Sequence, residues 1–86
     1  MASFDYVIQD EVGIHARPAG ELVTKVKSFS NNQVEVSKGD KVADAKKLFQ
    51  LLKLGVKKGD TVTVKVTGEN EETVSKELEE FFKTHL

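Results

Sequence analysis

The stretch Gly13-Ile14-His15-Ala16-Arg17-Pro18-Ala19-Gly20 contains the only arginine and the only proline of the chain, together with one of its two histidines. Every other residue of the lysine and arginine class is a lysine. The planar guanidinium of arginine pairs with anions in a geometry that lysine does not reproduce. A single arginine placed two positions after a histidine therefore indicates a site that requires this side chain.

Pro18 marks the start of a helix, because proline fixes its own backbone dihedral, lacks an N–H and fits the first helical turn. We predict a helix that begins at residue 16 or 17 and ends near residue 28. We expect Ala16 to face the core with the apolar residues that recur at helical spacing, which are Ala19, Leu22, Val23, Val26 and Phe29. Gly13 allows a sharp turn before the helix, so His15 stands at or just before the N-cap.

The start of this predicted helix is suited to an anion. The first helical amides have no internal acceptor, and the helix dipole places positive charge there. Arg17 adds a full charge that costs the helix a few tenths to about 1 kcal/mol, which is reasonable where an anion is often bound. The anion could be free phosphate, a carboxylate of a partner, or a phosphoryl group on His15, whose neutral imidazole is a nucleophile near physiological pH. An isolated His-x-Arg would need no more than a capping histidine and a solvated arginine.

The complete string Gly-Ile-His-Ala-Arg-Pro-Ala resembles the signature of HPr, the histidine-containing phosphocarrier family of the bacterial sugar phosphotransferase system. The resemblance implies that His15 accepts a phosphoryl group on Nδ1 from phosphorylated enzyme I and passes it to enzyme IIA domains for sugar uptake. Arg17 and the backbone amides of Ala16 and Arg17 would stabilise that group. Such a protein is a covalently modified intermediary rather than an enzyme acting on a free small molecule. The alternative is a regulatory protein of the same fold that docks partners without onward phosphoryl transfer.

The composition sets further limits. A chain of 86 residues is long enough for one domain, residues 1–86, with a single modest core. A net charge of −1 gives no global attraction to nucleic acid or a membrane surface. Cysteine is absent, and His15 and His85 alone make no convincing zinc site, so we expect neither metal nor cofactor. No signal-peptide pattern or bilayer-spanning segment is visible, so we expect a cytoplasmic protein without membrane insertion, and a monomer.

Periodicity predicts strands over residues 3–8, 33–37, 41–43 and 61–67, and two further helices. The second helix would begin at an Asp44 N-cap and stop at Gly55, and the third would begin at an Asn70 N-cap. The order β-α-β-β-α-β-α predicts a two-layer α+β fold, with three helices covering one face of a sheet. The resemblance implies an open-faced sandwich whose four-stranded antiparallel sheet has the order 1-4-2-3.

The second predicted helix carries more apolar residues than packing alone requires. Leu48, Phe49 and Leu52 form one stripe, while Leu51 and Leu54 point partly elsewhere. Periodicity alone allows all of these leucines to be core. The resemblance implies instead that Leu48, Phe49 and Leu52 are an exposed docking patch for enzyme I and enzyme IIA, with Leu51, Leu54 and Val56 buried. Gly20 either lets a partner approach closely or is a tolerated surface glycine.

Three smaller expectations concern single positions. By the resemblance, Lys47 occupies the position of a regulatory serine found in many family members, so we predict no serine-phosphate regulation there. Asp10 and Glu11 could tune the nearby histidine, but a solvated loop is the favoured interpretation. His85 is expected to be a solvated tail residue.

Overall fold

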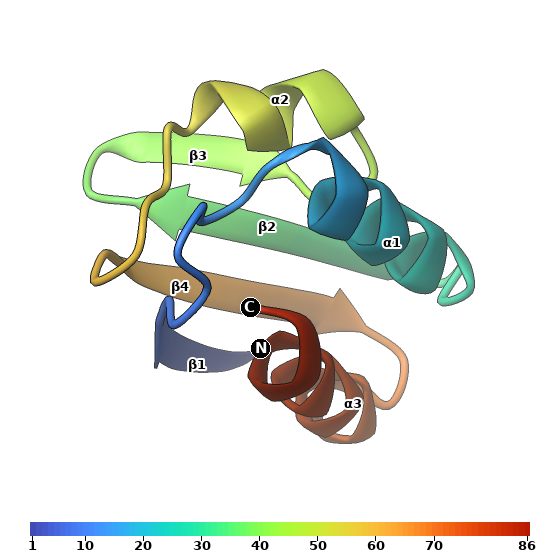
Figure 1. Cartoon of the computed structure of the whole chain (residues 1–86). Coiled ribbons are helices and arrows are strands. Elements are labelled where there is room, and N and C mark those ends of the chain that lie inside the picture. Colours follow the sequence, from blue (N-terminus) through green and yellow to red (C-terminus); the bar gives the residue numbers. More distant parts are fainter.

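The computed structural model describes all 86 residues and contains one four-stranded antiparallel sheet with three helices. The strands are β1 (Ala2–Val7), β2 (Asn32–Lys38), β3 (Lys41–Asp44) and β4 (Thr61–Gly68), in the order β1-β4-β2-β3. The helices are α1 (Ala16–Lys27), α2 (Leu48–Lys53) and α3 (Glu71–His85), and they lie on one side of the sheet (Figure 1). The predicted two-layer α+β fold, element order and strand order are confirmed.

The two central strands, β4 and β2, supply the inner face of the sheet. Val62, Val64 and Val66 of β4 are fully buried, and alternate residues of the strand are exposed or half-buried. This alternation follows from the period of two along a strand that has one face toward the core. Val64 pairs with Val36 of β2 on one side and with Phe4 of β1 on the other, so three strands contribute apolar side chains to one layer.

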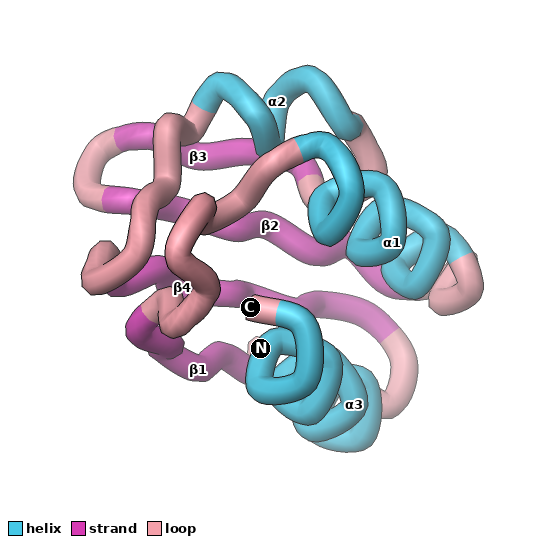
Figure 2. Tube along the Cα trace, in the orientation of Figure 1, coloured by secondary structure: helices cyan, strands magenta, loops and turns pink.

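The helices close the other side of this core. Phe82 of α3 is fully buried, and its ring makes edge contacts with Phe4 and Tyr6, both at a centroid distance of 5.7 Å. From α1, Leu22 and Val26 are fully buried. Figure 2 shows that the loop leading into α1 passes beside the end of α3, and the amides of Gln9 and Asp10 both donate to the carbonyl of Leu86. The loop before α1 is therefore held by the end of the chain that follows α3.

Two details of the predicted helices are wrong. α2 begins at Leu48 with Lys47 as its N-cap, because Asp44 still pairs with Glu35 in β3 and its Oδ1 accepts the amide of Lys46 at 2.9 Å. An aspartate can form such a turn with the backbone two residues on, in place of capping a helix. Ala16 is exposed, because at about 100° per residue it lies roughly 90° from the centre of the buried stripe of α1.

Candidate functional site

His15 is the N-cap of α1, as predicted. Its backbone is extended, with φ −124° and ψ −177°, and its carbonyl accepts the amide of Ala19 at 2.9 Å. Its side chain makes no capping hydrogen bond and is 39% exposed. The imidazole is therefore held at the surface by its backbone, while the ring nitrogens are not used to cap the helix.

Gly13 sets the path of the chain into this N-cap. It has a φ of +80°, which favours glycine, and a Cβ at this position would overlap the carbonyl oxygen of Val56 and lie 2.7 Å from the Cα of Lys57. The next residue, Ile14, is buried and donates its amide to the same Val56 carbonyl at 3.2 Å. The close approach of Gly13 to the segment after α2 thus fixes the backbone two residues before His15.

The first amides of α1 are free to bind an anion. The amides of Ala16 and Arg17 donate to no acceptor of the chain, Pro18 has no N–H, and the first turn contains no acidic residue. The positive end of the helix dipole is therefore not offset by a side chain of the same turn. The amides of Ala16 and Arg17, which the resemblance implies would stabilise a phosphoryl group, therefore follow the histidine with no partner in the chain.

Arg17 lies on the same cleft as His15. This cleft of about 300 Å³, here called the His15 cleft, is lined by Asp10, His15, Arg17, Pro18, Glu21, Thr84 and His85. The Arg17 side chain is 88% exposed, and its Nε lies 3.6 Å from Oε1 of Glu21, one turn further along α1. The structure therefore brings the predicted histidine and arginine to one surface and gives the arginine an exposed carboxylate neighbour.

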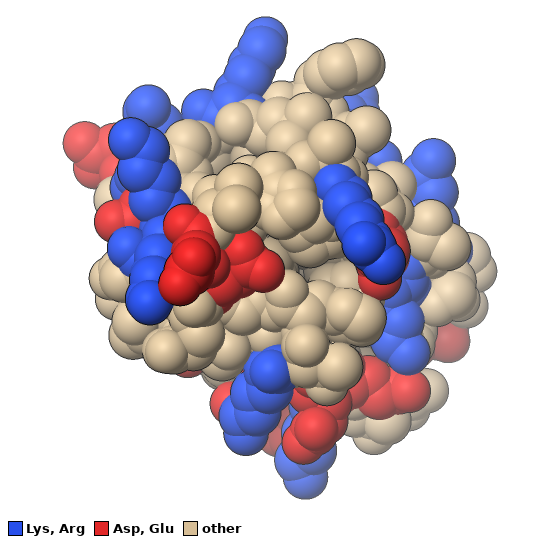
Figure 3. Space-filling view, in the orientation of Figure 1, with Lys and Arg blue, Asp and Glu red and all other residues tan.

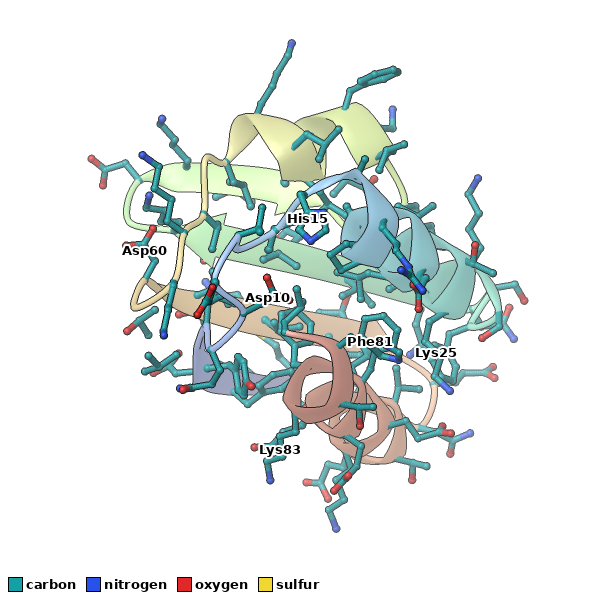
Figure 4. All side chains as sticks on the ribbon, in the orientation of Figure 1. Asp10, His15, Lys25, Asp60, Phe81 and Lys83 are labelled. Carbon is teal, nitrogen blue, oxygen red and sulfur yellow. The ribbon has the colours of Figure 1, made fainter.

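Asp10 is both a loop residue and a neighbour of the histidine. Its Oδ1 accepts the amide of Val12 at 2.9 Å and lies 4.0 Å from Nε2 of His15 (Figure 4). The sequence favoured a solvated loop for Asp10. That interpretation did not include its proximity to His15. The Nε2 side of the ring faces a carboxylate, which leaves Nδ1 as the nitrogen on the other side of the ring.

His85 is exposed to solvent, as predicted, but it belongs to α3 and not to a tail, so that part of the prediction is wrong. It is the last residue of α3, its ring lies over that of Phe81 at a centroid distance of 4.4 Å, and its Nδ1 is 3.5 Å from Oε2 of Glu21. Sequence reasoning missed both His85 and Glu21 as members of the cleft. The signals were present as spacings of four residues, from Phe81 to His85 and from Arg17 to Glu21, which place each pair on one helix face.

The surface of α2 agrees in part with what the resemblance implied, because only Phe49 of the three predicted patch residues is fully exposed. Phe49 is 75% exposed, while Leu48 and Leu52 are half-buried and pack against the core. Leu51, Leu54 and Val56 are buried, so the predicted buried set is confirmed, and we call Leu48, Phe49 and Leu52 the α2 patch. In the space-filling view, the area over α2 and the start of α1 is mostly uncharged, with basic side chains at its margin (Figure 3).

Gly20 lies in α1 and lines a second, open surface hollow with Arg17, Glu21, Thr24, Lys25 and Phe81. A Cβ at residue 20 would meet no atom within 4 Å, so no packing contact requires a glycine there.

Lys47, at the position compared with the regulatory serine, is exposed. None of the three helices has both the length and the apolar composition needed to cross a membrane.

The half-exposed histidine at a helix N-cap, the free amides after it and the nearby arginine are features that a histidine phosphocarrier domain requires. The chain belongs to the HPr family of the phosphotransferase system. The family model described as "PTS HPr component phosphorylation site" matches residues 2–84. This membership places the chain among the phosphocarriers of that system.

Individual relatives agree with this assignment. The chain is 36% identical to the phosphocarrier protein HPr of Mycoplasma genitalium over 72 residues, which cover 84% of this chain and 82% of the relative. The crystal structure of HPr-C-His from Thermoanaerobacter tengcongensis superposes with a TM-score of 0.91 at 32% identity, over 99% of this chain and 94% of that one. A structure described as an HPr dimer from the same organism matches with a TM-score of 0.74 at 33% identity, over 92% and 90% of the two chains.

Proposed function

We propose that this chain accepts a phosphoryl group on Nδ1 of His15 from phosphorylated enzyme I and passes it to an enzyme IIA domain. The observation that carries the proposal is the half-exposed imidazole at the N-cap of α1, followed by the unpartnered amides of Ala16 and Arg17. In the first transfer, a bond forms between Nδ1 and phosphorus while the bond from phosphorus to the donor atom of enzyme I breaks. The electron pair of that broken bond leaves with enzyme I. The second transfer repeats the exchange with the enzyme IIA acceptor.

The site suits temporary storage of the group. A phosphoryl group on His15 carries about two negative charges, as phosphorylated side chains do near neutral pH. The two free amides, the helix dipole and Arg17 all offer positive charge at the same end of α1. The site is open to solvent, which keeps these interactions moderate, and a carrier that must release its cargo requires moderate binding.

Arg17 has to change partner in this proposal, and the change costs little. Its present contact with Glu21 is an exposed pair of residues four apart on a helix, and such pairs contribute about 0.3–0.5 kcal/mol. A guanidinium facing a phosphoryl group with two charges gains a stronger, charge-assisted interaction. Asp10, close to Nε2 of His15, would keep that side of the ring toward the loop and leave Nδ1 for the transfer.

The α2 patch, together with Gly20, is proposed as the docking surface for enzyme I and enzyme IIA. The exposed ring of Phe49 offers apolar surface. Burial of that surface against a partner would favour association. The protein is proposed to act as a cytoplasmic monomer and a single domain of residues 1–86, with no serine-phosphate control at Lys47. It needs no cofactor or metal for the transfer in this proposal.

The proposal is tested by incubating the protein with phosphoenolpyruvate and enzyme I and then adding an enzyme IIA. We expect an acid-labile, alkali-stable modification at His15, its loss in His15→Ala, and transfer to enzyme IIA. Absence of labelling in the wild type would refute the phosphocarrier proposal. Labelling without onward transfer would favour the regulatory alternative.

The docking surface is tested with two matched substitutions on α2. Phe49→Ala should slow phosphoryl transfer while changing the unfolding free energy by less than about 0.5 kcal/mol, because the ring is exposed. Leu51→Ala, at a fully buried position, should cost about 2–5 kcal/mol. A large loss of stability in Phe49→Ala, or an unchanged transfer rate, would argue against a docking role.

A further inference from the structure

The carboxylate of Glu21 is shared between two helices. Its Oε1 lies 3.6 Å from Nε of Arg17, and its Oε2 lies 3.5 Å from Nδ1 of His85. Arg17 and Glu21 belong to α1, whereas His85 ends α3, so the glutamate links the two helices across the His15 cleft. Neither the phosphoryl acceptor nor its amides need such a link.

The contact between Arg17 and Glu21 opposes the role proposed for Arg17. Glu21 lies one turn further along α1, so this contact draws the guanidinium away from the N-cap at which a phosphoryl group on His15 would sit. When Arg17 turns to that group, Glu21 remains as a negative charge on the same cleft. It would then repel the phosphoryl group and attract Arg17 back.

His85 is placed to keep Glu21 from drawing Arg17 back. Its ring is supported by Phe81, and its Nδ1 already faces the free oxygen of Glu21. Figure 4 shows Phe81 on the face of the molecule that also presents His15 and Asp10. The other charged or titratable groups that line the cleft around His85 are Arg17 of α1 and Asp10 and His15 of the preceding loop, so Arg17 is the competing partner for Glu21.

We propose that His85 is a positioning residue of this site: it holds Glu21 on the side of α3 and thereby releases Arg17 to the phosphoryl group on His15. This inference rests on the proposed function. In the resting protein Glu21 contacts both partners, and in the phosphorylated protein it is retained by His85 alone. His85 therefore acts through Glu21 and does not contact the phosphoryl group.

The test compares the hydrolysis rate of the phosphorylated proteins by ³¹P NMR. His85→Phe keeps a ring against Phe81 but removes both ring nitrogens, so Glu21 competes fully for Arg17. Because exposed ion pairs are worth little, we expect hydrolysis to accelerate about two- to fivefold. His85→Lys places a hydrogen-bond donor that can hold Glu21 at this position, and should return the rate toward that of the wild type.

A double-mutant comparison separates this mechanism from a structural role. In the background of Glu21→Gln there is no carboxylate to retain, so adding His85→Phe should leave the hydrolysis rate unchanged. An equal acceleration in both backgrounds would overturn the proposal, as would a wild-type rate in His85→Phe alone. If the wild type takes no phosphoryl group, both the function and this inference fail, whereas a labelled wild type with an insensitive His85→Phe rejects the inference only.

A further readout needs no phosphoryl group. The exchange of the Arg17 Nε–H with water, followed by NMR in the resting protein, should slow in His85→Phe, because Glu21 is then committed to Arg17. The same exchange should accelerate in Glu21→Gln. Exchange that is identical in the three proteins would show that His85 and Arg17 do not compete for Glu21, and would refute the proposal.

Discussion

Replacing Gly13 with alanine tests how strongly the backbone near His15 depends on one glycine. A left-handed backbone costs a non-glycine residue about 1–2 kcal/mol, and forcing an extra methyl into a packed contact costs about 1–3 kcal/mol. Both apply here, since φ is +80° and the added Cβ would overlap the Val56 carbonyl. Alanine also reduces the conformational freedom of the unfolded chain, which offsets about 0.4–1 kcal/mol of this loss of stability. The expected net loss of stability is therefore about 1–4.5 kcal/mol.

Urea unfolding followed by circular dichroism measures this loss. For a domain of this size, an m-value of about 1 kcal/mol/M predicts that the midpoint falls by about 1–4.5 M. Gly20→Ala is the matched control: this glycine lies inside α1 with open space around it, so alanine should stabilise by about 0.5–1 kcal/mol. A Gly13→Ala protein within 0.5 kcal/mol of the wild type would refute the argument that the contact with Val56 requires glycine.

Three further substitutions probe the framework around the site. Asp60 contacts the Lys38 ammonium at 2.9 Å, and that hydrogen bond, aided by a backbone amide, holds the pKa of Asp60 below its ordinary 3.8. The unfolded chain then binds the proton more readily, so this stabilisation is present above pH 3.8 and is lost as the pH falls through the lowered pKa. Asp60→Asn should therefore flatten the decline of stability in acid, and an unchanged acid profile would contradict it. Asn32→Ala should cost about 1–3 kcal/mol in urea unfolding, because the buried amide donates to the carbonyls of Thr67 and Glu69, whereas the exposed Asn31→Ala should change stability by less than about 0.5 kcal/mol. Phe82→Ala should cost about 3–5 kcal/mol, and a loss below 1 kcal/mol would show that the ring contacts with Phe4 and Tyr6 are not central to the core.

Local patterns in the sequence predicted the elements that have strong periodicity. The alternation of Val62, Val64 and Val66 identified β4, and Pro18 located the start of α1 to within a residue. The strand order came from the family resemblance, because periodicity shows which face of a strand is apolar but not which strand lies beside it. The predicted start of α2 failed because Asp44 can bond the backbone either as a cap or as a turn.

The site was predictable to the extent that it lies in one continuous stretch. His15, Arg17 and the first amides of α1 are neighbours in sequence, so one motif identified them all. The contact of Glu21 with His85 joins residues at opposite ends of the chain, and it depends on how α1 and α3 lie across the sheet. Amphipathic spacing identifies the buried face of each helix but carries no information on which exposed side chains of two helices meet.

The place of β4 in the sheet also bears on how the protein is made. β4 lies between β1 and β2, and Val7 of the first strand pairs with Thr61 of the last. A ribosome releases β1 long before its only neighbour in the sheet exists, so the sheet cannot grow strand by strand during synthesis. The loop that carries His15 continues directly from β1, and the amides of Gln9 and Asp10 in this loop have the Leu86 carbonyl as their acceptor. This loop should therefore take its final shape only after Leu86 has been released from the ribosome.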